Sequence, residues 1–183
     1  QEAVAELSNR VSRLEALLKI SRMMNATTNQ KTLVTNIAKE VGTYMKADRC
    51  SIFFHDRMTD ELYTHVAMGL SDGQEIRMPS DVGIAGYAFQ SGEVLNAPDV
   101  DREPRFSRES ARKTGYETRC MLAFPVKNRR GKAIGVFQML NKQGEPGYFT
   151  QEDEAFLEEL VGQIADLLDL MLRKEELAQR NAV

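Results

Sequence analysis

Apolar side chains recur every three or four residues at the start of the chain. Between Glu2 and Met24 they occupy the positions Val4, Leu7, Val11, Leu14 and Leu18, and polar residues fill the other face. This spacing is the heptad pattern by which helices pair in coiled coils, sustained here over about three heptads. It predicts an N-terminal helix over residues 1–26 that forms a dimer seam. The alternative is an amphipathic helix packed on the sheet of its own domain.

A second heptad pattern lies near the C-terminus. It predicts a helix from about Gln151 to about Gln179 whose apolar seam is Leu157, Leu160, Ile164, Leu167 and Met171. A helix this long outruns a domain of this size. We therefore expect long signalling helices at both ends of a sensor domain. The chain divides into a coiled-coil-like helix (1–26), a central domain (27–170) and a C-terminal extension of the last helix (171–183).

Between these ends, the periodicity alternates between helix and strand. It predicts helices at Lys31–Met45 and Ile84–Gln90, and strands at Arg49–His55, Glu61–Ala67, Glu75–Met78, Glu93–Asn96, Cys120–Lys127 and Ala133–Leu140. The stretch 97–119 is charged and weakly periodic, which predicts a functional loop. This order predicts an α+β fold, an antiparallel sheet of about six strands with helices on its faces.

Composition and charge narrow the possible functions. The 183 residues are 42% hydrophobic and 28% charged with a net charge of −3, which gives no global attraction to nucleic acid or to an anionic membrane. No apolar run is long enough to span a bilayer and no signal peptide is visible, so we expect a cytoplasmic protein. Cys50 and Cys120 form neither a disulfide framework nor a metal-binding spacing. His55 and His65 have no evident third ligand, so we expect no metal site, and we also expect no cofactor.

The end of the last predicted strand carries the most informative motif. The strand stops at Asn141-Lys142, and a turn-rich linker leads to Phe149 and a helix that opens at Thr150. Thr150 and Asp153 have the spacing of a capping box, with Asp in place of the preferred Glu or Gln. Lys142 and Asp153 carry opposite charges and can clasp the end of the strand to the start of the helix.

The spacing Asn141-Lys142…Phe149-x-x-x-Asp153-Glu154 resembles the signature of the GAF domains that bind cyclic nucleotides in phosphodiesterases and bacterial adenylyl cyclases. All of its fixed positions match. The resemblance covers about residues 33–168 and implies the GAF fold. It also implies that the Lys142–Asp153 pair supports the fold around a ligand without contacting that ligand.

A helix start with small residues offers a candidate anion site. The run is Gly83-Ile84-Ala85-Gly86, and the amides of Ile84 and Ala85 are expected to point out of the N-terminus of the helix. Such amides can bind a cyclic phosphate, although a tight turn whose amides contact water is the alternative. In cyclic-nucleotide GAF domains this run supplies the phosphate amides, so the resemblance implies a phosphate site here.

The resemblance implies further ligand contacts within the 97–119 stretch. Phe106 matches an aromatic of a loop that packs over the ligand, or else anchors that loop. Thr114 and Thr118 match a T-G-aromatic-x-T-R stretch whose hydroxyls bond to the ribose or phosphate. Their alternative roles are a turn before Gly115 and the start of a strand.

The resemblance places the base of the nucleotide against the sheet. Arg49 and Ser51 match the family's R-C-S stretch, in which the serine position reads the purine edge. Gln138 matches a polar position facing the ligand, although it can instead face solvent on the other side of the strand. Met68 stands where some members carry a base-reading residue, and it can pack on a purine.

These features lead to one hypothesis and two alternatives. We expect a regulatory domain without catalysis that binds cyclic AMP, less readily cyclic GMP. It would signal as a homodimer through its terminal helices to an output domain of the adenylyl cyclase or phosphodiesterase type. One alternative is a GAF domain that serves only as a ligand-free dimerising spacer. The other is a small enzyme like the GAF-type methionine sulfoxide reductases, which need reactive cysteines.

Overall fold

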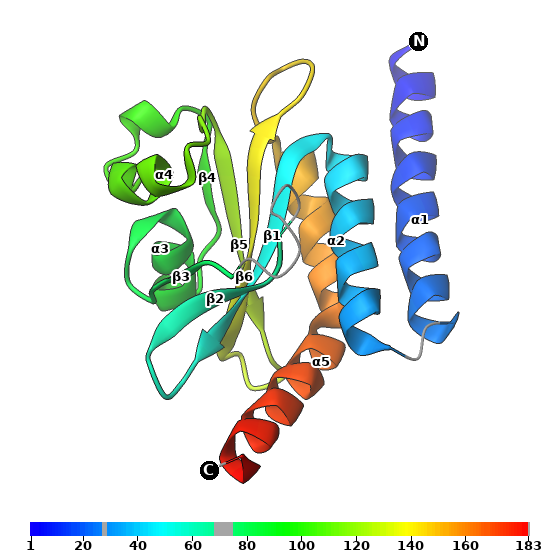
Figure 1. Ribbon diagram of the computed structural model, residues 1–183. Helices are drawn as coiled ribbons and strands as arrows, with labels where there is room; N and C mark the ends of the chain where they lie inside the picture. The colour runs from blue at the N-terminus through cyan, green and yellow to red at the C-terminus, as the bar shows by residue number, and fades with distance from the viewer. Residues whose placement is uncertain (27–28, 68–74, 183) are drawn as a thin grey trace.

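A computed structural model describes residues 1–26, 29–67 and 75–182 of the protein (Figure 1). The helices are α1 (Glu2–Ala26), α2 (Gln30–Met45), α3 (Gly83–Ser91), α4 (Arg108–Thr114) and α5 (Gln151–Asn181), with a short 3₁₀ helix η1 (Val100–Arg102). The strands are β1 (Ala47–Asp56), β2 (Glu61–Ala67), β3 (Arg77–Pro79), β4 (Leu95–Ala97), β5 (Met121–Lys127) and β6 (Ala133–Lys142). The predicted α+β fold is confirmed.

All strand pairs of the sheet are antiparallel, and the strand order is β3-β2-β1-β6-β5-β4. The two ten-residue strands, β1 and β6, lie at its centre. Their register places Ser51 opposite Gln138 and Arg49 opposite Leu140. Directly paired residues of an antiparallel sheet project to the same face. The register therefore gathers these four residues on one face of the sheet.

Helices cover both faces of the sheet, but unequally. Figure 1 shows α1, α2 and α5 on one side and the shorter helices α3 and α4 on the other. The buried side chains accordingly form two clusters, a large one that includes Ile52 and Phe54 and a smaller one that includes Phe53 and Val136. Because successive residues of β1 enter opposite clusters, that strand is buried on both faces. The smaller layer contains the pocket described below.

The prediction of a loop over residues 97–119 is partly wrong, because this stretch contains η1 and the two-turn helix α4. The side chain of Ser107 accepts a hydrogen bond from the amide of Ser110 and so caps the start of α4. Gly115 ends the helix with a φ of +67°. A helix this short shows no apolar periodicity, and the caps were its only sequence signal. The strand predicted at Glu75–Met78 is also displaced, since β3 begins at Arg77.

The two heptad seams have different fates in the structure. The C-terminal seam is largely buried in the large core cluster, including Leu157, Leu160, Ile164 and Met171. The predicted long C-terminal helix is present, and these seam residues pack within their own chain. The α1 seam faces outward instead, and α1 docks on the domain through Ala16 and Ile20.

The long terminal helices do not have the character of membrane spans. Across the described ranges, every helix is too short or too polar to cross a bilayer.

Candidate functional site

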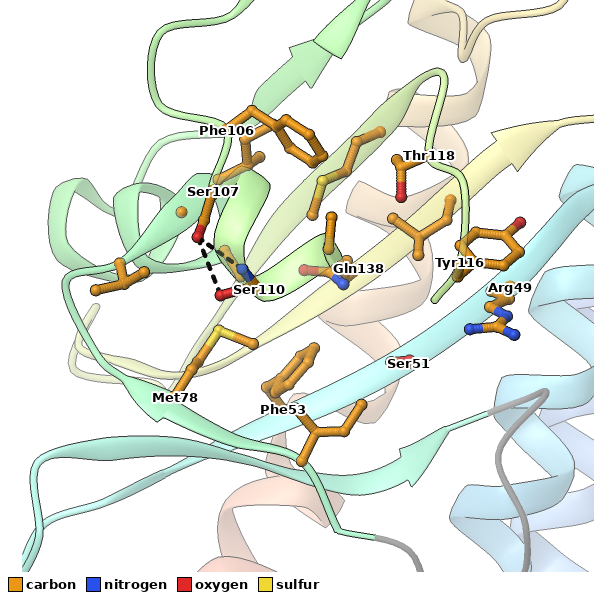
Figure 2. A pocket seen from close by; sticks show the side chains of 18 residues that line it. Arg49, Ser51, Phe53, Met78, Phe106, Ser107, Ser110, Tyr116, Thr118 and Gln138 are labelled. Atoms are coloured by element: carbon orange, nitrogen blue, oxygen red, sulfur yellow. Dashed lines mark hydrogen bonds between the residues drawn. The ribbon is translucent and has the colours of Figure 1, made fainter. Parts of the chain in front are cut away.

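A pocket lies between the sheet and the layer formed by α3 and α4 (Figure 2). Its free volume is about 110 Å³, whereas one water molecule needs about 10–15 Å³. The protein's own side chains therefore do not fill it. The predicted ligand-binding residues that line it are Arg49, Ser51, Gly83, Ile84, Ala85, Phe106, Thr118 and Gln138. The fold thus brings together residues that lie up to 89 positions apart in the sequence (138 − 49).

Two of the predicted residues are not placed at the pocket. Met68 lies outside the described residues. Thr114 is the last residue of α4, and its side chain is likewise outside the described part of the structure. Their proposed contacts remain predictions.

The floor of the pocket comes from β1, β5 and β6. Ser51 and Gln138 are direct partners across β1 and β6, and Figure 2 shows both among the side chains that line the cavity. Gln138 is half-buried on the face that carries α3 and α4. This placement excludes the alternative that it points to solvent on an open side of the strand. Phe53 and Leu140 surround these two polar groups with apolar surface.

The start of α3 forms one wall of the pocket. Its N-cap residue is Val82, which has no side-chain oxygen to accept a hydrogen bond from the first amides. Within the described residues, the amides of Ile84 and Ala85 donate no hydrogen bond, and both residues line the cavity. An uncapped helix start carries free N–H groups and a partial positive charge. This wall therefore suits an anion.

Two glycines shape this helix start. Gly83 has a φ of +74°, a left-handed conformation that side chains disfavour. A Cβ added to Gly86 would stand 2.7 Å from the carbonyl carbon of Asp81, too close for any real contact. Gly86 therefore lets α3 pack tightly against the turn that precedes it.

The roof of the pocket comes from the segment that was predicted to be a loop. Phe106 packs against the smaller core cluster and also lines the cavity, which fits both a cover for a ligand and an anchor for this segment. Ser107 and Ser110 are joined by a hydrogen bond of 3.0 Å between their hydroxyls, drawn as a dashed line in Figure 2. Sequence reasoning missed Ser107, Ser110 and Ala111 as lining residues because it did not predict α4.

Arg49 and Tyr116 close one end of the pocket. The guanidinium carbon of Arg49 lies 3.7 Å from the centre of the Tyr116 ring, a cation–π contact. The Tyr116 hydroxyl donates a hydrogen bond to the carboxylate of Asp48. Burial, followed by this carboxylate, raises the pKa of Tyr116 to about 12. Among the described residues that line the cavity, Arg49 alone is charged, so the pocket carries positive charge without an acidic side chain.

Asn141 holds the segment that carries Tyr116 and Thr118. Its side-chain oxygen accepts hydrogen bonds from the amides of Arg119 and Cys120, at 2.7 and 3.3 Å. Its side-chain nitrogen donates to the hydroxyl of Tyr116 and to the carbonyl of Glu117, both at 2.9 Å. Its φ of +58° is one that asparagine tolerates better than most residues. The first signature residue thus fixes one side of the pocket without lining it.

The predicted clasp between Lys142 and Asp153 is present. The ammonium nitrogen lies 3.1 and 3.0 Å from the two carboxylate oxygens, and the two side chains are only 12% and 11% exposed. Asp153 also completes the predicted capping box with Thr150. Phe149 is buried, and Asn96 donates hydrogen bonds to its carbonyl and to Glu154. Within the described lining, none of the five signature residues contributes to the pocket.

Both cysteines lie away from the pocket. Cys50 and Cys120 are buried in the large core cluster beneath α1, α2 and α5. Burial raises the pKa of Cys50 to about 12, which disfavours a thiolate. Within the described ranges, no three His, Cys, Asp or Glu side chains converge in a way that could hold a metal ion. The described lining of the pocket contains neither cysteine.

The GAF domain family matches residues 29–168, and the chain belongs to this family. Over 123 residues it is 35% identical to a dual 3′,5′-cyclic-AMP and -GMP phosphodiesterase 11A of Takifugu rubripes. This match covers 61% of the chain and 14% of the phosphodiesterase, so the chain corresponds to a small part of that relative.

Solved structures share the fold. The GAF domain of a phosphoenolpyruvate-protein phosphotransferase from Coxiella burnetii has a TM-score of 0.79 and 23% identity, over 91% of this chain and 98% of that one. The corresponding Acinetobacter domain has a TM-score of 0.75 and 24% identity, over 90% and 97%. A free methionine-R-sulfoxide reductase from Neisseria meningitidis, solved with its substrate, has a TM-score of 0.69 and 22% identity, over 93% and 92%. At these identities the likeness shows the fold alone.

Proposed function

We propose that this GAF domain is a sensor that binds a cyclic nucleotide and prefers cyclic AMP to cyclic GMP. The observation that carries the proposal is the pocket itself. It joins an uncapped helix start, one cation and two polar floor residues within a largely apolar lining, in space that the chain leaves open. A ligand with one anionic group and one flat heterocycle matches these features.

The phosphate is proposed to bind at the start of α3. A cyclic phosphate is a compact monoanion, and the amides of Ile84 and Ala85 lack recorded partners within the described structure. Helix starts of this kind bind phosphate without needing a positive side chain. Arg49 adds the only charge among the described lining residues, and that charge has the favourable sign. Thr118 also lines the pocket and can offer its hydroxyl to the ribose or the phosphate.

The base is proposed to lie on the floor of the sheet. The side-chain amide of Gln138 both donates and accepts, which complements the neighbouring donor and acceptor of an adenine edge. No carboxylate in the described lining is placed to accept the paired N–H donors of guanine. The Takifugu relative is named for its action on both cyclic nucleotides, which supports this ligand class for the chain.

Signalling is proposed to pass through the terminal helices of a homodimer in the cytoplasm. A nucleotide that contacts the floor, α3 and the 97–119 roof can bind one arrangement of these elements better than another. Only such a difference in affinity can shift an equilibrium between states. The output domain would be an adenylyl cyclase or a phosphodiesterase domain elsewhere in the full-length protein.

Calorimetric titration with cyclic AMP, cyclic GMP and 5′-AMP tests the proposal on the intact chain. We expect saturable binding that is tightest for cyclic AMP and weakest for 5′-AMP. Absence of heat together with absence of thermal stabilisation at millimolar nucleotide would contradict it. That outcome would leave the ligand-free spacer as the better description.

Two buried alanines of α3 provide a matched pair of variants. Ala85 and Ala88 are 2% and 0% exposed, but only Ala85 belongs to the described lining of the pocket. Ala85→Leu and Ala88→Leu add the same volume to one helix, so each is expected to destabilise folding by roughly 1–3 kcal/mol. We expect Ala85→Leu to abolish binding and Ala88→Leu to retain it. Equal loss in both variants would point to a folding effect and away from this wall of the pocket.

A further inference from the structure

The helix α1 has an apolar face that its own domain leaves uncovered. Its inner face docks on the domain through Ala16 and Ile20, which are 6% and 0% exposed. Its outer face carries five large apolar residues that remain 48–71% exposed, namely Val4, Leu7, Val11, Leu14 and Leu18. Rows of large apolar residues on a surface mark interaction sites, whereas isolated ones are unremarkable.

The identity of these residues restricts what can cover them. In the heptad frame, Val4, Val11 and Leu18 occupy the a positions and Leu7 and Leu14 the d positions. A β-branched residue at a combined with leucine at d favours a parallel pair of helices over higher oligomers. Valine occupies two of the three a positions, and leucine occupies both d positions. The row therefore fits a second copy of itself.

Charges beside the row agree with this arrangement. Arg10 stands at a g position and Glu15 at the following e position. In a parallel, in-register pair, each g residue meets the next e residue of the other helix. The Arg10 of each copy therefore faces the Glu15 of the other copy, which gives one such ion pair on each side of the seam. An antiparallel pair centred on the row would bring the two Arg10 side chains together instead. Arg10 also contacts Glu6 of its own helix at 3.1 Å, and a guanidinium has enough N–H groups for both.

We propose that α1 pairs with α1 of a second copy of this chain as a parallel, in-register, two-stranded coiled coil. Figure 1 shows α1 and α5 running in the same sense, from the top of the view to the bottom. A two-fold axis along α1 therefore sends both α5 C-termini to the same side of the dimer. The C-terminal seam stays buried within each chain. This proposal gives the homodimer its interface and orientation, and it stands whether or not the pocket binds a nucleotide.

Sedimentation equilibrium of the whole chain tests the interface. We expect a monomer–dimer equilibrium with the dimer dominant at high micromolar concentration. The double variant Leu7→Asp, Leu14→Asp should be monomeric while keeping the thermal transition of its domain. Met58→Asp is the control, since Met58 is an apolar residue 78% exposed in the turn after β1. A monomeric parent chain, or a double variant that still dimerises, would overturn the proposal.

Cross-linking tests the orientation independently. The native cysteines are buried, so single variants Leu7→Cys and Leu14→Cys each present one accessible thiol. In the parallel register each variant should form a covalent dimer with itself under mild oxidation, because equivalent d positions lie within disulfide reach. Met58→Cys should form none. Covalent dimers that appear only when the two variants are mixed would show an antiparallel pair, and their absence in every sample would exclude the in-register seam.

Discussion

At the scale of single residues, Tyr116 shows how the site is held together. It lines the pocket, stacks under Arg49 and bonds through its hydroxyl to Asp48 and Asn141. The sequence placed it in a motif but gave it no role, because its partners come from β1 and β6. A partly buried phenol beside a carboxylate resists losing its proton.

This environment predicts a pH dependence of stability. The pKa of Tyr116 is about 12 in the folded protein against an ordinary value of 10.0, so the folded state holds this proton more tightly. Its contribution to the free energy of unfolding is therefore complete below pH 10 and declines as pH rises toward 12. We expect the parent chain to lose stability more steeply than Tyr116→Phe across this range. Urea denaturation at a series of pH values measures both slopes.

The exposed Tyr148 supplies the control for this experiment. A Tyr148→Phe variant should keep the steep slope of the parent chain. Parallel slopes for the parent and the Tyr116→Phe variant would contradict the assigned environment of Tyr116.

At the scale of elements, the junction between β6 and α5 depends on one ion pair. Lys142 ends the strand, Asp153 lies in the first turn of the helix, and both side chains are nearly buried. Asp153 also accepts a hydrogen bond from the amide of Thr150, so one carboxylate serves the cap and the clasp together. A buried charge that loses its partner is costly, because it has already been removed from water.

We therefore expect Lys142→Met to destabilise the domain by about 3 kcal/mol, the cost of leaving a nearly buried carboxylate unpaired. Nucleotide affinity should change little, since Lys142 is not among the described lining residues. Chemical denaturation and calorimetry separate the two effects. Arg129→Met is the matched control, because its pair with Asp166 at 2.7 Å is exposed and such pairs contribute little. Equal destabilisation by both substitutions would show that burial does not matter at this junction.

At the scale of the whole molecule, the pocket and α1, the helix proposed to dimerise, lie on opposite sides of the sheet. Figure 1 shows α3 and α4 on one side and α1, α2 and α5 on the other. A bound ligand can therefore influence the terminal helices only through the sheet or around its edges. Such coupling requires that the ligand stabilise one arrangement of the whole domain.

Cyclic AMP, the proposed ligand, is expected to raise the melting temperature of the chain, because a ligand that binds the folded state stabilises it. At a hundredfold excess over its Kd, a ligand stabilises the folded state by about 2.7 kcal/mol. For a protein of this size the gain corresponds to roughly 5–10 °C. Differential scanning calorimetry at rising nucleotide concentration measures the shift. An equal shift in Ala85→Leu would place the binding site away from the pocket.

Most of the elements could be predicted from the sequence, but the site could be predicted only in part. The helices α2, α3 and α5 follow local periodicity, and the structure confirms their predicted ranges within a few residues. The helix α4 escaped prediction because two turns are too short to show an apolar period. Gln138 could be placed on a strand, but its neighbours on the sheet decide whether it faces the solvent or the pocket.

The sequence by itself determined the periodicities, the helix caps, the clasp between Lys142 and Asp153 and the small residues at the start of α3. All of these depend on spacing along the chain, which the sequence states directly. Only the tertiary structure decided which of two similar heptad seams is buried and which lies open on α1. Apolar spacing shows that a helix has a face to cover, but the packing of distant elements determines what covers it. For the same physical reason, the sequence could name some of the residues that line the pocket, but only the sheet register and the packing of α3 and α4 bring them around one cavity.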